Sequence, residues 1–279
     1  MRTLEQWLGT PLFHRGSSGK ARLVATEAAE RALPDIRAGF ERLTLGMERM
    51  RENSPSGVLT VTVSPAFAAK WLLPRIERFH AAWPDTDVRL DTQLKAVDFL
   101  TQRIDIGVRY GAGHWPGLIA EKLMDEEIYP VCSPLLKNTP DCLQTLAELA
   151  NETLIHDLSM DGHAGFTTWA TWLQTVGMKD LSTQRGMKIN NSAAVLQAAI
   201  DGQGIALARS VMAQDDLAAG RLIRLFPDIQ FVSPLAYYVV YRSECVSLPR
   251  LKAFRDWLFE EVRTLSKDRW LAFGAAIAK

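Results

Sequence analysis

The chain has 279 residues, of which 47% are hydrophobic, and its 32 basic side chains balance its 32 acidic ones. This length and composition are typical of one large or two modest globular domains. A net charge of zero excludes broad coating of nucleic acid or of an anionic membrane surface, although it is compatible with local charged patches. The first 22 residues carry four basic side chains against one acidic side chain, so a small basic segment precedes a neutral body.

Targeting signals and disulfides are not expected from this sequence. No apolar run approaches the roughly 18 residues that a membrane span needs, and the start lacks the basic, apolar and small segments of a signal peptide. We therefore expect a cytoplasmic protein with no membrane partner. Cys132, Cys142 and Cys245 are odd in number and lack CxxC spacing, which favours reduced thiols over disulfides or a zinc site.

The first 25 residues predict the end of a helix followed by a β-hairpin. Leu4, Trp7 and Leu8 recur at helical spacing, and the Gly9-x-Pro11 that follows is typical of a helix stop. The next stretch, "PLFHRGSSGKARL", has apolar ends around a middle of glycine, serine and basic residues. This pattern is typical of a short hairpin with a polar tip.

Residues 26–53 predict a dimerising helix. Their apolar positions recur alternately four and three residues apart over about three heptads, which is a 3.5-residue repeat. The stripe consists of Ala29, Leu33, Ile36, Phe40, Leu43, Met47 and Met50. The alternative is an amphipathic helix packed on its own domain, but no neighbouring segment is apolar enough to cover the stripe. Pro34 lies within the pattern and predicts a kink or a break.

After the polar hinge at residues 53–57, strand-like and helix-like segments alternate, which predicts an α/β domain with a mostly parallel sheet. Strands are expected at 58–63, 86–92, 104–110, 153–157, 186–191, 204–209 and 235–242. Helices are expected at 67–84, 167–177, 192–202 and 248–265, with a short helical stretch between 92 and 104. Because about 210 residues exceed the usual single sheet, two lobes are expected.

Signature motifs of enzymes are missing. The sequence contains no GxSxG, HExxH or P-loop motif, and "GQG" at 202–204 lacks the third glycine of a dinucleotide fingerprint. We therefore expect neither catalysis nor a cofactor. His156, Asp157, Asp161 and His163 lie close together in the sequence, but a loop of this composition is more often simply polar and solvated, so no metal site is expected.

Binding of a small ligand is better supported than catalysis. In open α/β sheets, ligands bind at the carboxyl ends of strands, where the N-termini of helices attract carboxylates. Two such junctions occur, one at Ser64 and one at Asn191, and Arg109 ends a third strand. Ordinary helix capping is the alternative at each junction. Taken together, the three positions indicate a small anionic or zwitterionic ligand.

Several long motifs carry a family resemblance. "RTLEQWLGTPLFHR", "TEAAERALP" and "SPAFAAKWLLPRIERFHAAWPDTDVRL" resemble the LysR-type transcriptional regulators. "RIDIGVRYGAGHWPGL" and "NNSAAVLQAAIDGQGIALARS" are similar to the branch of that family that contains the glycine-cleavage activator. The motifs occur in the family's order and span nearly the whole chain.

The resemblance implies a winged helix-turn-helix remnant at 1–25, a linker and dimerisation helix at 26–53, and a two-lobed effector domain at 57–265. That α/β domain would be like type 2 periplasmic-binding proteins, with lobe 1 at 57–130 and 230–265 and lobe 2 at 131–229. Residues 266–279 would be a tail. The implied partners are promoter DNA, a second or further copies in a homodimer or homotetramer, and a small effector such as an amino acid or organic acid.

The resemblance also implies roles for individual residues. The implied DNA contacts are Arg2, His14, Arg15, Lys20 and Arg22. The implied effector contacts are Ser64, Ala66, Phe67, Arg109, Tyr110, His156, Asn191, Ser192 and Tyr238. The family's first two helices and most of its recognition helix would precede Arg2, so we expect a truncated DNA-reading domain that binds DNA weakly. The alternatives are a solute-binding module without DNA-binding activity and an enzyme built on the same two-lobed fold.

Overall fold

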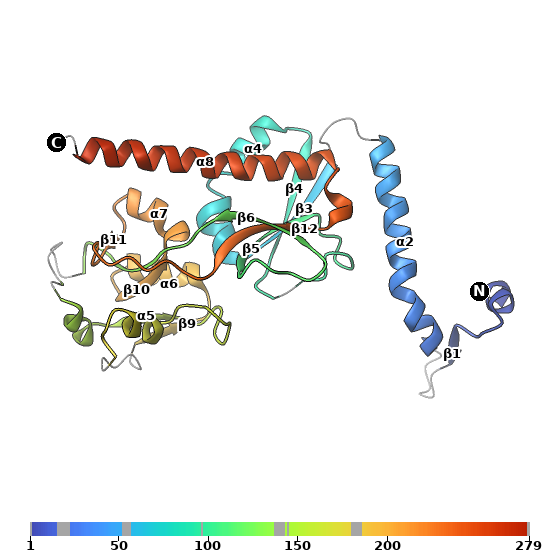
Figure 1. Cartoon of the computed structure of the whole chain (residues 1–279), viewed down its shortest axis with the longest axis horizontal. Coiled ribbons are helices and arrows are strands. Elements are labelled where there is room, and N and C mark those ends of the chain that lie inside the picture. Colours follow the sequence, from blue (N-terminus) through green and yellow to red (C-terminus); the bar gives the residue numbers. More distant parts are fainter. Residues whose placement is uncertain are drawn as a thin grey trace. The chain divides into compact units, whose positions relative to one another are not determined.

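The computed structural model describes residues 2–15, 23–51, 57–95, 97–136, 143, 145–179 and 186–277, the last twelve of these by their backbone alone (Figure 1). The chain divides into two compact units, Met1–Asn53 and Ser54–Lys279. Lys20, Arg22 and Cys142 lie outside the described residues.

The first unit begins with the expected helix and hairpin. Helix α1 (Arg2–Leu8) precedes strands β1 (Phe13–Arg15) and β2 (Leu23–Ala25), which pair antiparallel with Phe13 opposite Ala25. The Glu5 carboxylate accepts hydrogen bonds from the backbone N–H groups of Leu12 and Phe13, at 2.8 and 3.3 Å. An acidic side chain of α1 thus fixes the start of the hairpin, and the predicted hairpin is confirmed.

Helix α2 (Glu27–Arg51) follows directly and is longer than most. The Thr26 hydroxyl accepts a hydrogen bond from the backbone N–H of Ala29, which is the usual cap at a helix start. Pro34 lies inside α2 without ending it, so the predicted break does not occur. The apolar stripe is uncovered in the single chain: Phe40 is 68% exposed and Leu43 is 66% exposed.

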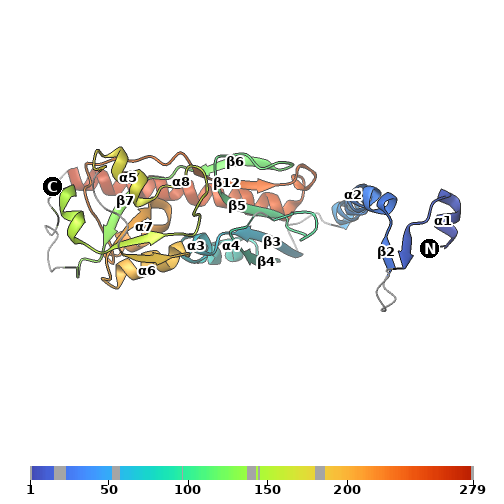
Figure 2. The same cartoon turned by 90° about the horizontal axis from the view of Figure 1, so that it is seen from below.

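The second unit contains two five-stranded sheets (Figures 1 and 2). The first sheet has the order β4-β3-β5-β12-β6. Its strands are β3 (Gly57–Val63), β4 (Thr86–Thr92), β5 (Ile106–Gly111), β6 (Ile119–Met124) and β12 (Ala236–Tyr241). Strand β3 runs parallel to β4 and β5, whereas β12 runs antiparallel to both of its neighbours.

The helix predicted at 67–84 is divided into three pieces. These are α3 (Pro65–Phe67), a π-helix (Ala68–Leu72) and α4 (Ile76–Ala82). Pro74 lies in the turn between the π-helix and α4, where its missing N–H group removes one helical hydrogen bond. Phe79 of α4 packs edge-to-face on Phe254 of α8 (Pro249–Ile277), with ring centroids 5.1 Å apart. This aromatic contact joins α4 to α8.

The second sheet has the order β11-β7-β10-β8-β9. Its strands are β7 (Ile128–Cys132), β8 (Leu154–Asp157), β9 (Met187–Ile189), β10 (Ile205–Arg209) and β11 (Ile223–Arg224). Its helices are a 3₁₀-helix (Leu146–Asn151), α5 (Trp169–Thr175), α6 (Ser192–Ile200) and α7 (Ser210–Ala218). Trp169 and Trp172 of α5 lie in its core, which also contains the buried thiol of Cys132.

The chain crosses between the sheets twice. Three expectations are corrected here, the first by these crossings, the second by the extent of α8 and the third by the strand pairing. It leaves the first sheet after β6 and returns after β11, and Glu127 bridges Val232 where the two crossings meet. The lobe border placed between 130 and 131 therefore falls inside β7. The tail placed from 266 begins inside α8, which runs to Ile277. The sheets are mixed rather than mostly parallel, because β7, β11 and β12 pair antiparallel with their neighbours.

Candidate functional site

A small cavity of about 50 Å³ lies where the two lobes meet. Tyr110 of β5 is its lining residue from the first lobe, and the remaining lining residues come from the second. The polar and aromatic members of that second group are His156, Asp157, Phe166, Thr167, Thr168, Trp169 and Arg209. The cavity is therefore bordered by the end of β8, the loop before α5 and the end of β10.

Arg209 is the main charged group of this cavity. It is 7% exposed, and its Nη2 donates a hydrogen bond to Ser192 Oγ at 2.6 Å. Ser192 in turn donates its proton to Asp157 Oδ2 at 2.5 Å. The guanidinium lies 4.9 Å from the ring centroid of Tyr110 and 6.0 Å from that of Phe166. Such cation–π contacts favour a charged guanidinium between the rings.

The surroundings keep Arg209 protonated. Burial alone would lower the pKa of this guanidinium, but the nearby Tyr237, Asp157, Tyr110 and Glu126 raise it above its ordinary value. Burial also raises the pKa of Tyr110 to about 12. The cavity therefore holds a cation beside the neutral phenol of Tyr110.

Glu126 lies next to this cluster, on the crossing between β6 and β7. It is 2% exposed, and its Oε1 accepts hydrogen bonds from the Ser210 hydroxyl at 2.5 Å and from the Val211 N–H at 3.0 Å. Its Oε2 has no hydrogen-bond partner among the described residues. Burial raises the pKa of Glu126 to about 7, against the opposing effects of Ser210 and Arg209. This carboxyl group therefore titrates near neutral pH.

Three of the effector contacts implied by the resemblance belong to this cluster. Tyr110 and His156 line the cavity, and Ser192 accepts a hydrogen bond from Arg209. The first two side chains come from different lobes, as a ligand site between lobes requires. Tyr110 is also fixed by a hydrogen bond between its hydroxyl and Ser233 Oγ, at 2.7 Å.

Arg109 and Tyr238 do not line the cavity. They are opposite each other on β5 and β12, and successive residues of a strand point to opposite faces, so they lie on the face away from Tyr110. Arg109 donates to the Gln93 carbonyl at 2.7 Å and to Thr62 Oγ1 at 2.6 Å, both within its own lobe. Burial lowers the pKa of this guanidinium. Its hydrogen bonds therefore hold the first lobe together.

The two predicted helix starts are capped by their own side chains. Ser64 Oγ accepts a hydrogen bond from the Phe67 N–H, and Asn191 Oδ1 accepts from the N–H groups of Ala193 and Ala194. The helices that they begin, α3 and α6, lie beside each other (Figure 2). Ala66 is buried, and Phe67 is buried against Trp71 and Tyr237. Ser64, Ala66, Phe67 and Asn191 do not line the cavity. Ser64 and Asn191 act as ordinary helix caps, which was the alternative expected at each junction.

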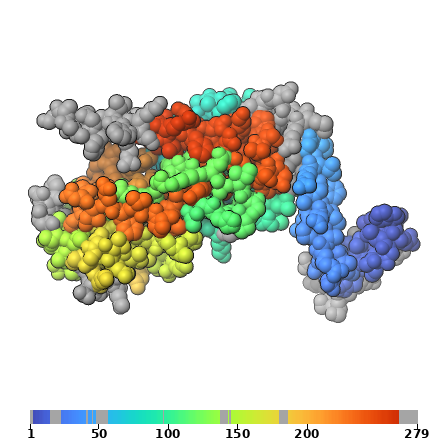
Figure 3. All heavy atoms as spheres, viewed as in Figure 1, coloured from blue at the N-terminus to red at the C-terminus, as the bar shows by residue number. Residues whose placement is uncertain are grey.

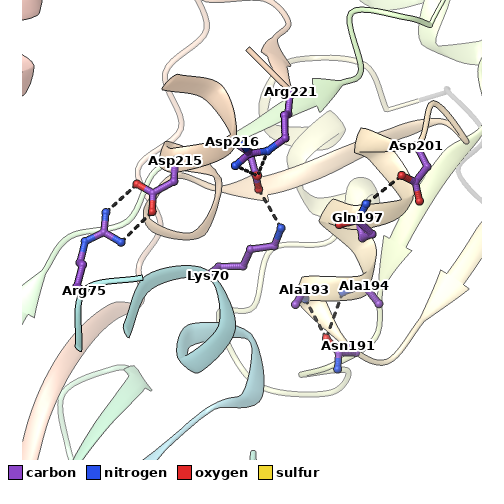
Figure 4. Close-up of polar contacts among 10 residues, drawn as sticks. All are labelled: Lys70, Arg75, Asn191, Ala193, Ala194, Gln197, Asp201, Asp215, Asp216 and Arg221. Carbon is purple, nitrogen blue, oxygen red and sulfur yellow. Dashed lines mark hydrogen bonds and ion pairs between the residues drawn. The ribbon is translucent and has the colours of Figure 1, made fainter. Parts of the chain in front are cut away.

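Ion pairs join the lobes beside the cavity. Arg75 of the first lobe makes a bidentate pair with Asp215 of α7, at 2.7 and 2.8 Å, and Lys70 pairs with Asp216 at 3.0 Å (Figure 4). Arg221 also pairs with Asp216, at 2.7 Å. Helix α8 packs against β6 on another side of this unit, where Figure 3 shows it in contact with the strand. The lobes are thus connected through α7 as well as through the two chain crossings.

The implied DNA contacts are only partly described. His14 is exposed on β1, and Arg2 and Arg15 are placed by their backbone in α1 and β1. Their roles therefore stay predictions.

Within the described ranges, no three histidine, cysteine or acidic side chains are grouped as a metal site would need, and this applies to His156, Asp157, Asp161 and His163. No helix in the described part of the chain has the length and apolar character to span a membrane.

Comparisons with known proteins identify the family. Residues 52–263 match the family model of the LysR substrate binding domain. The chain belongs to the LysR-type transcriptional regulators. It is 40% identical over 258 residues to the glycine cleavage system transcriptional activator of Escherichia coli K12, which covers 92% of this chain and 81% of that protein. It is 31% identical to the transcriptional activator AmpR of Pseudomonas aeruginosa, over 96% of this chain and 86% of AmpR.

Solved structures agree with this assignment. The effector domain of AmpR from Pseudomonas aeruginosa superposes with a TM-score of 0.63 and 30% identity, over 77% of this chain and 100% of that domain. The LysR-type regulator CrgA of Neisseria meningitidis, at 20% identity and a TM-score of 0.60, shares the fold over 94% of this chain and 87% of CrgA. The relatives are regulators and not enzymes.

Sequence reasoning missed Arg209. Its signal is the "GIALAR" strand, which ends in arginine directly before the helix that starts at Ser210. Arg109 lies near the end of its own strand, two residues before β5 ends at Gly111, so position along a strand does not distinguish the two arginines in the sequence.

Proposed function

We propose that this LysR-family chain is a cytoplasmic transcriptional regulator whose interlobe cavity binds a small anionic or zwitterionic effector. The observation that carries the proposal is a buried guanidinium, Arg209, at the meeting point of two lobes in a LysR substrate-binding domain. Lobes connected by two crossings and a few ion pairs can change their relative orientation when a ligand contacts both. Binding energy in the cavity would thereby alter how the protein holds DNA.

Promoter DNA is the proposed macromolecular partner. The relatives are named as transcriptional activators, and the first unit carries a hairpin with basic residues on and around it. Basic side chains of this kind contact phosphates, and their contribution falls as salt rises. We therefore expect Arg2, His14, Arg15, Lys20 and Arg22 to position the chain on DNA without reading its sequence.

Self-association through α2 is the proposed oligomeric contact. The exposed stripe consists of Leu33, Ile36, Phe40, Leu43 and Met47, each between 38% and 68% exposed; Met50 continues the pattern, and its side chain lies outside the description. A 3.5-residue apolar repeat that remains exposed in one chain is suited to a second copy of the same helix. The proposed state is a homodimer or a homotetramer.

One experiment tests the regulator against its alternative. Sedimentation of the purified chain should give a dimer or tetramer, and gel shifts with the DNA upstream of its own gene should show binding that weakens as salt rises from 50 to 200 mM. A monomer that binds small ligands and leaves DNA unshifted at 50 mM salt would favour the solute-binding module instead.

A further inference from the structure

We propose that Arg209, rather than Arg109, is the group that receives the carboxylate of the effector and so decides which ligands the cavity accepts. This inference rests on the proposed function, because it concerns the same cavity. It adds a ligand class and a specificity-determining residue. It is supported by the hydrogen bonds and charges that surround each basic side chain near the junction of the lobes.

The other basic side chains near the lobe junction already have acceptors. Arg109 gives both ends of its fork to the first lobe, through Gln93 and Thr62. Lys70 and Arg75 are in ion pairs with the acidic side chains of α7. None of these three lines the cavity. They are therefore satisfied without a ligand.

Arg209 differs from them in its partners. Among the described residues, no carboxylate oxygen lies within 4 Å of its guanidinium, and its recorded hydrogen bond is the one to Ser192. A guanidinium has five N–H donors. Because this side chain lines the cavity, donors not used by Ser192 are available to a molecule in that space. An ion buried without a direct counter-ion is costly, and an anionic ligand would remove that cost.

The position of this guanidinium is fixed before any ligand arrives. Tyr110 of one lobe and Phe166 of the other lie within 4.9 and 6.0 Å of it, and Ser192 anchors one nitrogen. Ser192 is itself held by Asp157 and Ser159. A planar fork held in this way matches a carboxylate, which it can bind through two parallel hydrogen bonds. Preorganisation of this kind adds affinity because less side-chain freedom is lost on binding.

The size of the cavity limits the ligand. A volume of about 50 Å³ is far below the roughly 300–1,000 Å³ of sites for drug-sized molecules. It is suited to a carboxylate with a few further atoms. The apolar part of such a ligand would lie against Ile155, Leu207 and Trp169, which also line the space.

The test measures ligand binding by the full chain with matched pairs of probes. Acetate, L-lactate and L-alanine carry the carboxylate, and acetamide, L-lactamide and L-alaninamide replace it with an amide. Thermal unfolding is followed at pH 7.5 with each probe at concentrations up to about 100 mM, and sodium chloride keeps the ionic strength constant. A ligand that binds the folded state alone raises the melting temperature as its concentration exceeds the Kd. We expect a shift with at least one carboxylate and none with its amide.

Variants then assign the shift to one arginine. Arg209→Gln should abolish the carboxylate-specific shift, and Arg209→Lys, which keeps the charge without the fork, should weaken apparent affinity at least fivefold. Arg109→Gln is the matched control, and it should keep the full shift relative to its own ligand-free melting temperature. Circular dichroism confirms folding, and if Arg209→Gln does not fold, the Lys variant carries the test.

Three results would overturn the inference: equal shifts in the wild type and the folded Arg209 variants, equal shifts with carboxylates and amides, or no carboxylate-specific shift in the wild type. Failure of the proposed function has a separate readout. A chain that binds carboxylates through Arg209 yet neither associates nor shifts DNA would leave this inference standing and remove the regulator.

Discussion

Replacing the buried Glu126 by glutamine should stabilise the second unit at alkaline pH. The Glu126 carboxylate is 2% exposed and retains one oxygen without a hydrogen-bond partner among the described residues. Its folded pKa of about 7 lies above the ordinary value of 4.5 because burial opposes the charged form. Glutamine keeps the shape and an acceptor for Ser210 and Val211, and it carries no charge at any pH.

The sign follows from proton binding. Between pH 4.5 and 7 the folded state binds more protons at Glu126 than the unfolded state does, so the stability of the wild type at this group falls as pH rises. Below pH 4.5 both states are protonated and no penalty remains. Above pH 7 the full penalty is present, and the gap between 4.5 and about 7 corresponds to about 3 kcal/mol. We treat this value as an upper limit, because water that reaches the carboxylate would reduce it.

The assay is thermal and urea unfolding of the wild type and Glu126→Gln at half-unit steps from pH 5 to pH 8.5. The variant should exceed the wild type by about 1 kcal/mol at pH 5, where the unfolded carboxyl group is already largely ionised, and by up to about 3 kcal/mol at pH 8. For a unit of this size the difference at pH 8 is a rise of roughly 6–12 °C in melting temperature. The matched control is Glu127→Gln. Because Glu127 pairs with Arg224 at 2.6 Å, that variant should lose stability at pH 8. A Glu126→Gln variant less stable than the wild type at pH 8, or one whose difference is the same at every pH, would refute the reasoning.

Three further predictions concern the rest of the chain. Phe40→Glu, on the exposed stripe of α2, should convert the oligomer to monomers by sedimentation, because it places a charge in the proposed interface. Asp215→Asn should lower the free energy of unfolding by about 2–4 kcal/mol in urea titrations, because it leaves the nearly buried Arg75 without its bidentate partner. Gly204→Ala should destabilise the second unit by more than about 2 kcal/mol. The reason is that Gly204 has a φ of +156° and that a Cβ there would lie 2.3 Å from the Thr153 carbonyl oxygen. An unchanged melting temperature would contradict this prediction.

Elements with strong periodic signals were predicted well. Strand β4 occupies the expected residues 86–92, and the hairpin and the long helix α2 form where the sequence placed them. Strand β7 was not predicted, and Pro130 in "IYPVC" is a residue that is found mainly in edge strands. The structure tolerates this proline since its carbonyl still accepts a hydrogen bond from the Leu225 N–H, at 2.9 Å. The loss of one donor therefore does not remove the strand from the middle of its sheet.

The effector contacts expected from the sequence stay predictions, and Arg209 was not among them. Tyr110 and His156 line the cavity as expected, because strand ends in α/β sheets meet at one edge. Arg109 was expected to contact the effector but does not line the cavity, and its acceptors cannot be read from a single sequence. Its acceptors, on Thr62 and Gln93, lie 47 and 16 positions away, so only the register of the sheet shows that they satisfy it. The two-residue period of a strand argues against placing both side chains in one cavity, because adjacent residues such as Arg109 and Tyr110 point to opposite faces of the sheet.

Helix α7 links the cavity to the contacts between the lobes. Arg209 directly precedes this helix, and Ser210 at its start donates to Glu126 on the crossing between the sheets. Its later residues Asp215 and Asp216 are bound to basic side chains of the first lobe. One helix of nine residues thus carries all of these contacts. A ligand that draws the Arg209 guanidinium toward itself would therefore act on the hydrogen bond at Glu126 and on both ion pairs together, which gives one small anion three points of influence on the angle between the lobes.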